Sequence, residues 1–277
     1  MSAIERATVG SAGSRTTDTE RRRRSVINRS QAIGLASVVG GVALWEVVAR
    51  LFFSPLFLPP PSAVWTRGVE LLQDGELWTD VTTSAQAYLI GLVIAIAAGG
   101  LIGIAMAASR TVRDVLDPWV SFLNATPTIA LAPLFILILG LGVSSKVAII
   151  AIVMVFPILL NTYYGLAGTD PNLVETARSY SARPWQVYVK VKFPMAVPSF
   201  VAGLRLGAAH GLVGVVVSEF FGAKAGVGLL IQESAETFDT AGLFVGIALL
   251  GFAGVVITYA LIFAERRVGR WRPAEEE

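Results

Sequence analysis

The hydrophobic residues of this chain fall into long continuous blocks, and they do not alternate with polar residues as they would in a half-buried strand. Apolar blocks of about 18 residues or more with few charges are typical of helices that cross a membrane. Six such spans can be placed, at roughly 32–53, 85–108, 118–141, 146–163, 197–220 and 241–263. The pattern therefore predicts an all-α integral membrane protein with six transmembrane helices.

Two of these spans contain internal proline. The third carries Pro118, Pro127 and Pro133, which predicts a kinked or broken helix. The fourth is short and contains Pro157. A membrane helix tolerates proline where neighbouring helices satisfy the freed backbone carbonyls. We therefore expect both helices to lie inside the bundle and not to face lipid alone.

Composition agrees with a membrane setting and excludes several kinds of site. Charged residues make up 15% of the chain, whereas a soluble domain carries about 25%. The chain has one histidine and no cysteine, which excludes disulfides, thiolate metal sites and histidine-based catalytic triads. It also lacks the Gly-x-x-x-x-Gly-Lys-Ser/Thr phosphate loop. The chain is therefore not predicted to be an enzyme, and another subunit must supply the energy for any driven process.

The distribution of basic residues predicts the orientation in the membrane. An even number of spans places both termini on one side. That side holds seventeen lysines and arginines, in the tail 1–30, the loop 109–117, the segment 164–196 and the C-terminus. The opposite side holds only Arg67, Lys146 and Lys224. Because cytoplasmic loops carry the excess of positive charge, both termini and the segment 164–196 are predicted to be cytoplasmic.

One transmembrane domain, residues 31–272, is expected between a disordered basic tail (1–30) and a short C-terminal tail (273–277). The run Arg21–Arg24 indicates an orientation signal, with binding of nucleic acid or specific lipids as the alternative. The first apolar run is too long for a signal peptide and has no small-residue cleavage site. The proline-rich stretch after it predicts a stiff external turn and a surface helix near 63–73.

The polar, basic segment 164–196 predicts a folded hairpin of two short helices. Asp170 can cap a first helix that starts at Pro171. Ser181 can cap a second helix, which Phe193-Pro194 would end. A loop that only joined two spans could be far shorter. We interpret this charged hairpin as a docking surface for a soluble partner.

The fifth span has two different faces. Gly203, Gly207 and Gly211 recur every four residues, a spacing that lets another helix approach closely. The opposite face, at about 100° per residue, carries two charged and four apolar side chains. These residues are Val201, Arg205, Ala208, Leu212, Val216 and Glu219.

Two interpretations of the charged face remain open. It can line a polar path through the membrane, to which Pro127 and Pro133 of the third span would contribute. Alternatively, Arg205 extends to the cytoplasmic surface and Glu219 caps the outer end of the helix. The glycines of the segment 222–228 have the wrong spacing for phosphate binding, and they predict a flexible external turn.

The hairpin resembles a known signature. Permeases of ABC importers carry a cytoplasmic motif that reads Glu-Ala-Ala, three residues, Gly, nine residues, Ile-x-Leu-Pro. Here Glu175-Thr176-Ala177 is followed at the same spacing by Ser181, in place of the glycine, and by Val191-Lys192-Phe193-Pro194. Further segments resemble the nitrate, taurine, aliphatic sulfonate and bicarbonate branch of these permeases, over roughly residues 45–272. They are Leu58–Val64, Thr126-Pro127 to Ala132-Pro133-Leu134, Phe156-Pro157 with Asn161-Thr162-Tyr163, and Ala202–Arg205.

This resemblance implies a type I ABC importer permease fold in a bacterial plasma (inner) membrane. It implies a homodimer or close heterodimer of permease subunits, two cytoplasmic ATPase subunits that bind ATP-Mg, and an external solute-binding protein. No cofactor on this chain and no nucleic-acid partner is implied. The residues expected to couple to the ATPase are those of the motif: Glu175, Thr176, Ala177, Ser181, Val191 and Pro194.

The motif does not identify the solute, which the resemblance restricts to nitrate, sulfonate, taurine, bicarbonate or a vitamin precursor. Two alternatives come from other functional classes. A secondary carrier driven by an ion gradient needs ionisable groups near the middle of the membrane, and Arg205, His210 and Glu219 are few for that purpose. A non-transporting anchor of soluble subunits would show no solute flux.

Overall fold

The computed structural model of the protein describes residues 32–221 and 223–268, and every element in these ranges is a helix. The predicted tails 1–30 and 273–277 lie outside the described residues. Within the described ranges, five helices are long and apolar enough to cross a membrane, and one bent pair makes a sixth candidate. The chain divides into two compact units between Trp65 and Thr66.

The first unit contains the helix Ala32–Phe52 and the start of α2 (Pro61–Gln73). Glu46 links them, because its carboxylate accepts the backbone N–H (3.0 Å) and the hydroxyl (2.8 Å) of Ser62. Arg50 donates to Glu46 at 2.6 Å and to the Ser62 hydroxyl at 3.0 Å. The bond to the Ser62 N–H satisfies a donor that no carbonyl within α2 can reach. The predicted surface helix is present, and it starts at the third proline of the turn.

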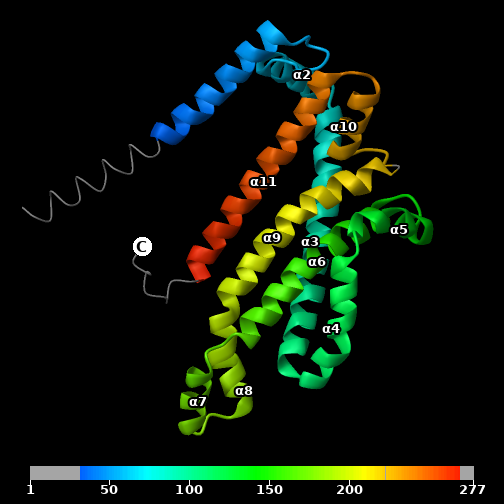
Figure 1. Cartoon of the computed structure of the whole chain (residues 1–277). Coiled ribbons are helices and arrows are strands. Elements are labelled where there is room, and N and C mark those ends of the chain that lie inside the picture. The colour runs from blue at the N-terminus through cyan, green and yellow to red at the C-terminus, as the bar shows by residue number, and fades with distance from the viewer. Residues whose placement is uncertain (1–31, 222, 269–277) are drawn as a thin grey trace, which may run out of the picture. The chain divides into compact units, whose positions relative to one another are not determined.

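In the second unit, α6 (Val143–Ala167) lies between α3 (Glu76–Ala108) and α9 (Phe193–Phe220) (Figure 1). α10 (Val227–Glu236) and α11 (Thr240–Val268) follow α9. The main apolar core joins α6 to its neighbours through Ile150, Met154 and Ile158. The expectation that the proline-containing fourth span is interior is therefore confirmed.

Glycines on α3 allow the close approach of α3 and α6. A Cβ atom added to Gly99 would lie 2.8 Å from the carbonyl oxygen of Val155. A Cβ atom on Gly103 would lie 2.7 Å from that of Leu159. Such small residues let two membrane helices pack backbone against backbone. This second glycine stripe was not predicted from the sequence, although its spacing of four residues is visible there.

The third predicted span is two helices with a bend of 90° between them. α4 (Arg110–Ala125) is capped by the hydroxyl of Ser109, so the predicted loop 109–117 is largely helical. A 3-10 turn, η1 (Thr128–Leu131), then leads into α5 (Ala132–Leu139).

The break in this span falls at Thr126-Pro127. Pro127 disfavours helical geometry at the residue before it, and Thr126 is extended. Pro133 occupies the first turn of α5, and Pro118 lies inside α4 without ending it. η1 and α5 pack on α6, so this part of the span does not face lipid alone, although Leu137 of α5 is 83% exposed.

The remaining predicted spans differ from the structure mainly at their ends. α3 starts at Glu76, nine residues before the predicted 85, because polar side chains of its first turns are bonded inside the protein. α6 extends beyond the predicted 146–163 at both ends. α10 was not predicted at all, because its ten residues follow a glycine-rich segment.

Candidate functional site

The segment between α6 and α9 is a folded hairpin, as predicted. α7 (Pro171–Ser179) has Asp170 as its N-cap, whose carboxylate accepts the N–H of Asn172 at 2.9 Å. Within α7, Glu175 and Thr176 are exposed and Ala177 is half-buried. These three motif residues therefore lie on a helix at one end of the bundle, where two of them are open to a partner.

The turn after α7 is a Schellman motif. The N–H of Ala182 donates to the carbonyl of Ala177 at 3.1 Å, and the N–H of Ser181 donates to that of Arg178 at 2.8 Å. Ser181 has a φ of 59°, in the left-handed region that glycine adopts most easily. The position where the importer signature has glycine is therefore the one position in this turn that favours it. Serine keeps the turn, although its Cβ makes this backbone conformation less favourable.

The second half of the hairpin is a continuous helical run, which corrects two predictions. α8 (Pro184–Val187) has Arg183 as its N-cap, so Ser181 does not cap it. α8 passes through a π-helical turn, η2 (Tyr188–Lys192), directly into α9, so Phe193-Pro194 ends no helix. The N–H of Phe193 bonds to the carbonyl of Tyr188, five residues back. This wider turn accommodates Pro194, which has no N–H to donate.

The hairpin exposes apolar as well as charged side chains. Tyr180 is 86% exposed and Trp185 is 57% exposed. Val191 and Pro194, the last motif positions, are both half-buried, Val191 in η2 and Pro194 at the start of α9. Exposed aromatic residues on a polar, basic segment are typical of a protein contact surface.

The glycine stripe of α9 faces α6. A Cβ atom on Gly203 would lie 2.8 Å from the carbonyl oxygen of Pro157, and one on Gly207 would lie 3.1 Å from that of Met154. Gly211 faces the side chain of the same methionine. The structure thus places these three glycines at the α6–α9 contact.

The residues proposed to line a path do not share one surface. Arg205 and Leu212 line a cavity of about 450 Å³ between α9 and α11. Val216 borders the start of α10, and Glu219 is fully buried. Pro127 and Pro133 lie at the bend between α4 and α5, where η1 and α5 pack on α6.

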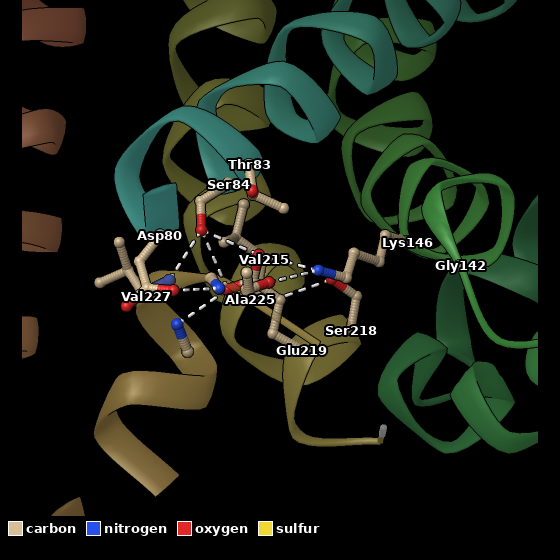
Figure 2. A network of polar contacts seen from close by, with 12 residues as sticks. Asp80, Thr83, Ser84, Gly142, Lys146, Val215, Ser218, Glu219, Ala225 and Val227 are labelled. Atoms are coloured by element: carbon tan, nitrogen blue, oxygen red, sulfur yellow. Dashed lines mark hydrogen bonds and ion pairs between the residues drawn. The ribbon is translucent and has the colours of Figure 1, made fainter. Parts of the chain in front are cut away.

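Glu219 belongs to a group of buried and half-buried polar residues where α3, α6, α9 and the start of α10 meet (Figure 2). We call this group the α10 cluster. Its members are Asp80, Ser84, Lys146, Glu219 and the backbone of residues 225–228.

The Glu219 carboxylate has three partners in the α10 cluster. It accepts the hydroxyl of Ser84 at 2.8 and 3.0 Å and the N–H of Gly228 at 2.8 Å. The ammonium group of Lys146 lies 3.5 Å away and donates to the carbonyl of Ala225 at 2.8 Å. The Lys146 side chain is 8% exposed and that of Glu219 is 0% exposed, so this is a buried ion pair.

The α10 cluster fixes the N-terminus of α10. The N–H groups of Gly226, Val227 and Gly228 donate to Asp80, Ser84 and Glu219 respectively, each within 2.9 Å. These are donors that a helix start leaves unsatisfied, and carboxylates there also complement the helix dipole. Three membrane helices thereby hold a fourth, short one.

The predicted flexible turn at 222–228 is therefore wrong over residues 225–228. Gly226 has a φ of 145°, a backbone conformation that residues other than glycine rarely adopt. A Cβ atom added to Gly226 would overlap the Glu219 carboxylate, and one on Gly228 would lie 2.9 Å from the Cβ of Glu219. The glycines are required because the helix start and the carboxylate approach closely.

Of the α10 cluster, only Glu219 was predicted from the sequence as a site residue. Lys146 entered only as one of the few basic residues opposite the hairpin, and Ser84 and Asp80 were not predicted. A usable signal was present: Lys146 and Glu219, one base and one acid, lie at the ends of two predominantly apolar spans. No group of three or more histidine, cysteine or acidic residues in the described ranges could hold a metal ion.

Comparison with known proteins identifies the family. Residues 99–270 match the family described as "Binding-protein-dependent transport system inner membrane component". The chain is 32% identical over 236 residues to the putative aliphatic sulfonates transport permease protein SsuC of Bacillus subtilis, covering 85% of this chain and 86% of that protein. It is 29% identical over 251 residues to the taurine transport system permease protein TauC of Escherichia coli, covering 88% and 91%.

Solved structures agree on the fold. A structure of the MetNI methionine ABC transporter in an inward-facing conformation matches with a TM-score of 0.59 at 18% identity, covering 70% of this chain and 94% of that one. At this identity the likeness shows the fold alone. Together with the family match, these findings show that the chain belongs to the inner membrane components of binding-protein-dependent transport systems and is an ABC importer permease.

Proposed function

We propose that this chain and a second permease subunit, a homodimer partner in the simplest case, form the translocation path of an ABC importer in a bacterial plasma membrane. Two separate ATPase subunits bind ATP-Mg and drive transport, and an external binding protein delivers the solute. The observation that carries the proposal is the hairpin. It keeps the spacing of the importer signature, and its Schellman turn has a left-handed residue at the glycine position.

The charge distribution supports a cytoplasmic hairpin and cytoplasmic termini. The described hairpin end carries Arg110, Arg113, Arg178, Arg183, Lys190 and Lys192. At the α10 end, Lys146 is buried against Glu219, and Arg67 donates to Asp239 at 2.8 Å. The bond to Asp239 raises the pKa of Arg67, so this arginine stays charged but is paired. Lys224, just before α10, is exposed. Exposed basic residues are still more numerous at the hairpin end, as the positive-inside rule requires of a cytoplasmic face.

The solute class follows from the relatives. The proteins similar to this chain are named for aliphatic sulfonates and taurine, and others for formylaminopyrimidine and riboflavin. We propose a small solute of the sulfonate, taurine, nitrate, bicarbonate or vitamin-precursor class, with an alkanesulfonate as the first compound to test.

Two substitutions in α7 test the docking role of the hairpin. Glu175→Lys reverses a charge on the exposed face, and Ala177→Trp adds bulk that a packed contact cannot accept. Both variants should insert normally, because α7 lies outside the membrane spans. Both should lose the ATPase subunits on purification, and ATP-dependent uptake in reconstituted vesicles should fall together with ATP hydrolysis.

The matched control is Glu236→Lys, a charge reversal on the exposed end of α10. It should retain the ATPase subunits. If both α7 variants also retain them with undiminished uptake, the hairpin is an ordinary loop and the proposal fails. Uptake that persists without ATP and follows an ion gradient would instead identify a secondary carrier, and absence of flux with all partners present would identify an anchor.

A further inference from the structure

One hydrogen bond joins the hairpin to α3. The hydroxyl of Tyr188, in the π-helical turn, donates to the backbone carbonyl of Ala107 at 2.8 Å. The two residues are 81 positions apart in the sequence. The ammonium group of Lys192 lies 4.9 Å from the centre of the Tyr188 ring, over its face. The tyrosine is therefore held on both its hydroxyl and its ring.

The Ala107 carbonyl is a suitable acceptor, because it lies in the last turn of α3. The final four carbonyls of a helix have no partner within that helix. The carbonyl of Ala105 is bonded by the N–H of Ser109, and that of Ala107 by Tyr188. Among the described residues, the bond from Tyr188 is the only hydrogen bond that connects the hairpin 170–192 to a helix other than α6 and α9, which flank it.

The opposite end of α3 is also fixed by hydrogen bonds. Asp80 and Ser84, in its first turns, hold the start of α10 within the α10 cluster (Figure 2). Between these ends α3 is an uninterrupted helix of 33 residues, about 50 Å long at 1.5 Å per residue. It packs along α6 through glycines. One rigid element thus connects the hairpin with the α10 cluster.

We propose that Tyr188 is a positioning residue that makes the C-terminus of α3 follow the hairpin, so that displacement of the hairpin reaches the α10 cluster through α3. This inference rests on the proposed function, because an ATPase must move the hairpin. α3 also packs on α6 and α9, which flank the hairpin, and the Tyr188 hydroxyl adds the direct link between the hairpin and the C-terminus of α3. Without that hydroxyl the hairpin moves against α3.

The test is Tyr188→Phe, which keeps the ring and its contact with Lys192 and removes only the donor. Because the chain has no cysteine, spin labels can be placed at Ser179→Cys on the hairpin and Arg110→Cys beside the end of α3. Both positions are exposed. The distance between the labels is measured in the assembled complex, with and without a non-hydrolysable ATP analogue and Mg²⁺.

With Tyr188 present, the distance distribution should keep one narrow peak in both states. In the Tyr188→Phe complex it should shift or broaden when the nucleotide binds. Uptake per ATP hydrolysed should fall about two- to tenfold, the range expected for one hydrogen bond, while ATP hydrolysis changes less than twofold. A purely structural role would lower both activities together through reduced assembly. Tyr164→Phe, on a 63% exposed side chain of α6 outside the hairpin 170–192, is the control and should change neither.

An unchanged distance distribution and unchanged uptake per ATP in Tyr188→Phe would overturn the proposal. This outcome is distinct from failure of the proposed function. If only the role of Tyr188 is wrong, the unmodified complex still performs ATP-driven uptake. If the proposed function is wrong, the unmodified complex does not.

Discussion

The buried ion pair of the α10 cluster gives the sharpest stability prediction. Lys146→Met removes the ammonium group and keeps most of the side-chain volume. The Glu219 carboxylate then retains its bonds from Ser84 and Gly228, but it loses the positive charge at 3.5 Å. The carboxylate is fully buried, so water cannot replace that charge.

The size of the effect follows from this geometry. Removing one member of a buried pair leaves an uncompensated charge, which costs about 3–5 kcal/mol. For a chain of this size each kcal/mol lowers the unfolding temperature by about 2–4 °C. We therefore expect Lys146→Met to lower it by about 6–20 °C. Glu219→Gln should act similarly, because it leaves the Lys146 ammonium group without a counter-charge.

The double variant separates charge from packing. Lys146→Met with Glu219→Gln has no buried charge at the pair, and the glutamine can still accept the N–H of Gly228. Its unfolding temperature should lie above that of either single variant. The assay is the fraction of purified protein that remains monodisperse after heating for a fixed time, because unfolding of membrane proteins is commonly irreversible.

An exposed pair provides the control. Arg110 lies 3.9 Å from Asp114, with its side chain 86% exposed. Arg110→Met should lower the unfolding temperature by no more than about 2 °C. Two results would refute this prediction. One is an unfolding temperature of Lys146→Met equal to that of the unmodified protein. The other is a decrease in the double variant as large as the sum of the decreases in the two single variants.

Two further predictions concern packing and topology. Gly103→Ala should reduce the yield of folded protein more than Gly211→Ala, because the new methyl group meets a backbone carbonyl in the first case and a flexible methionine side chain in the second. Gly251→Ala, which has open space around the new methyl group, is the control and should not change the yield. Equal yields for all three variants would contradict this prediction. Single cysteines at Ser181 and Thr237 should react with a membrane-impermeant reagent from opposite sides, and labelling of both from outside would contradict the proposed orientation.

Properties set by neighbouring residues could be predicted from the sequence. The apolar blocks located the spans, and Asp170-Pro171 located the start of α7, because hydropathy and helix capping are local. The bend at Thr126-Pro127 was only partly predicted. The prolines indicated a break, but a hydropathy window merges two apolar helices whatever the angle between them.

Contacts between distant parts of the chain could not be predicted in this way. Ser84 and Glu219 are 135 positions apart, and the lysine that pairs with this glutamate lies on a third helix. The sequence indicated that Glu219 is unusual in an apolar span, but not which groups satisfy it. Likewise, the role of Tyr188 depends on where α3 ends in space.

The bend between α4 and α5 has a consequence for how the protein is made. α4 has 16 residues and α5 has eight, so they are about 24 Å and 12 Å long. Neither crosses a hydrocarbon layer of about 30 Å alone.

Both pieces are held by α6, since Val120 of α4 packs with Phe156 and Leu159, and α5 packs on α6. The ribosome synthesises α6 after both of them. Insertion of this region therefore cannot proceed strictly in sequence order: α4 and α5 reach their final depth only once α6 has emerged. A nascent chain truncated before Val143 should leave the α4–α5 segment accessible to water.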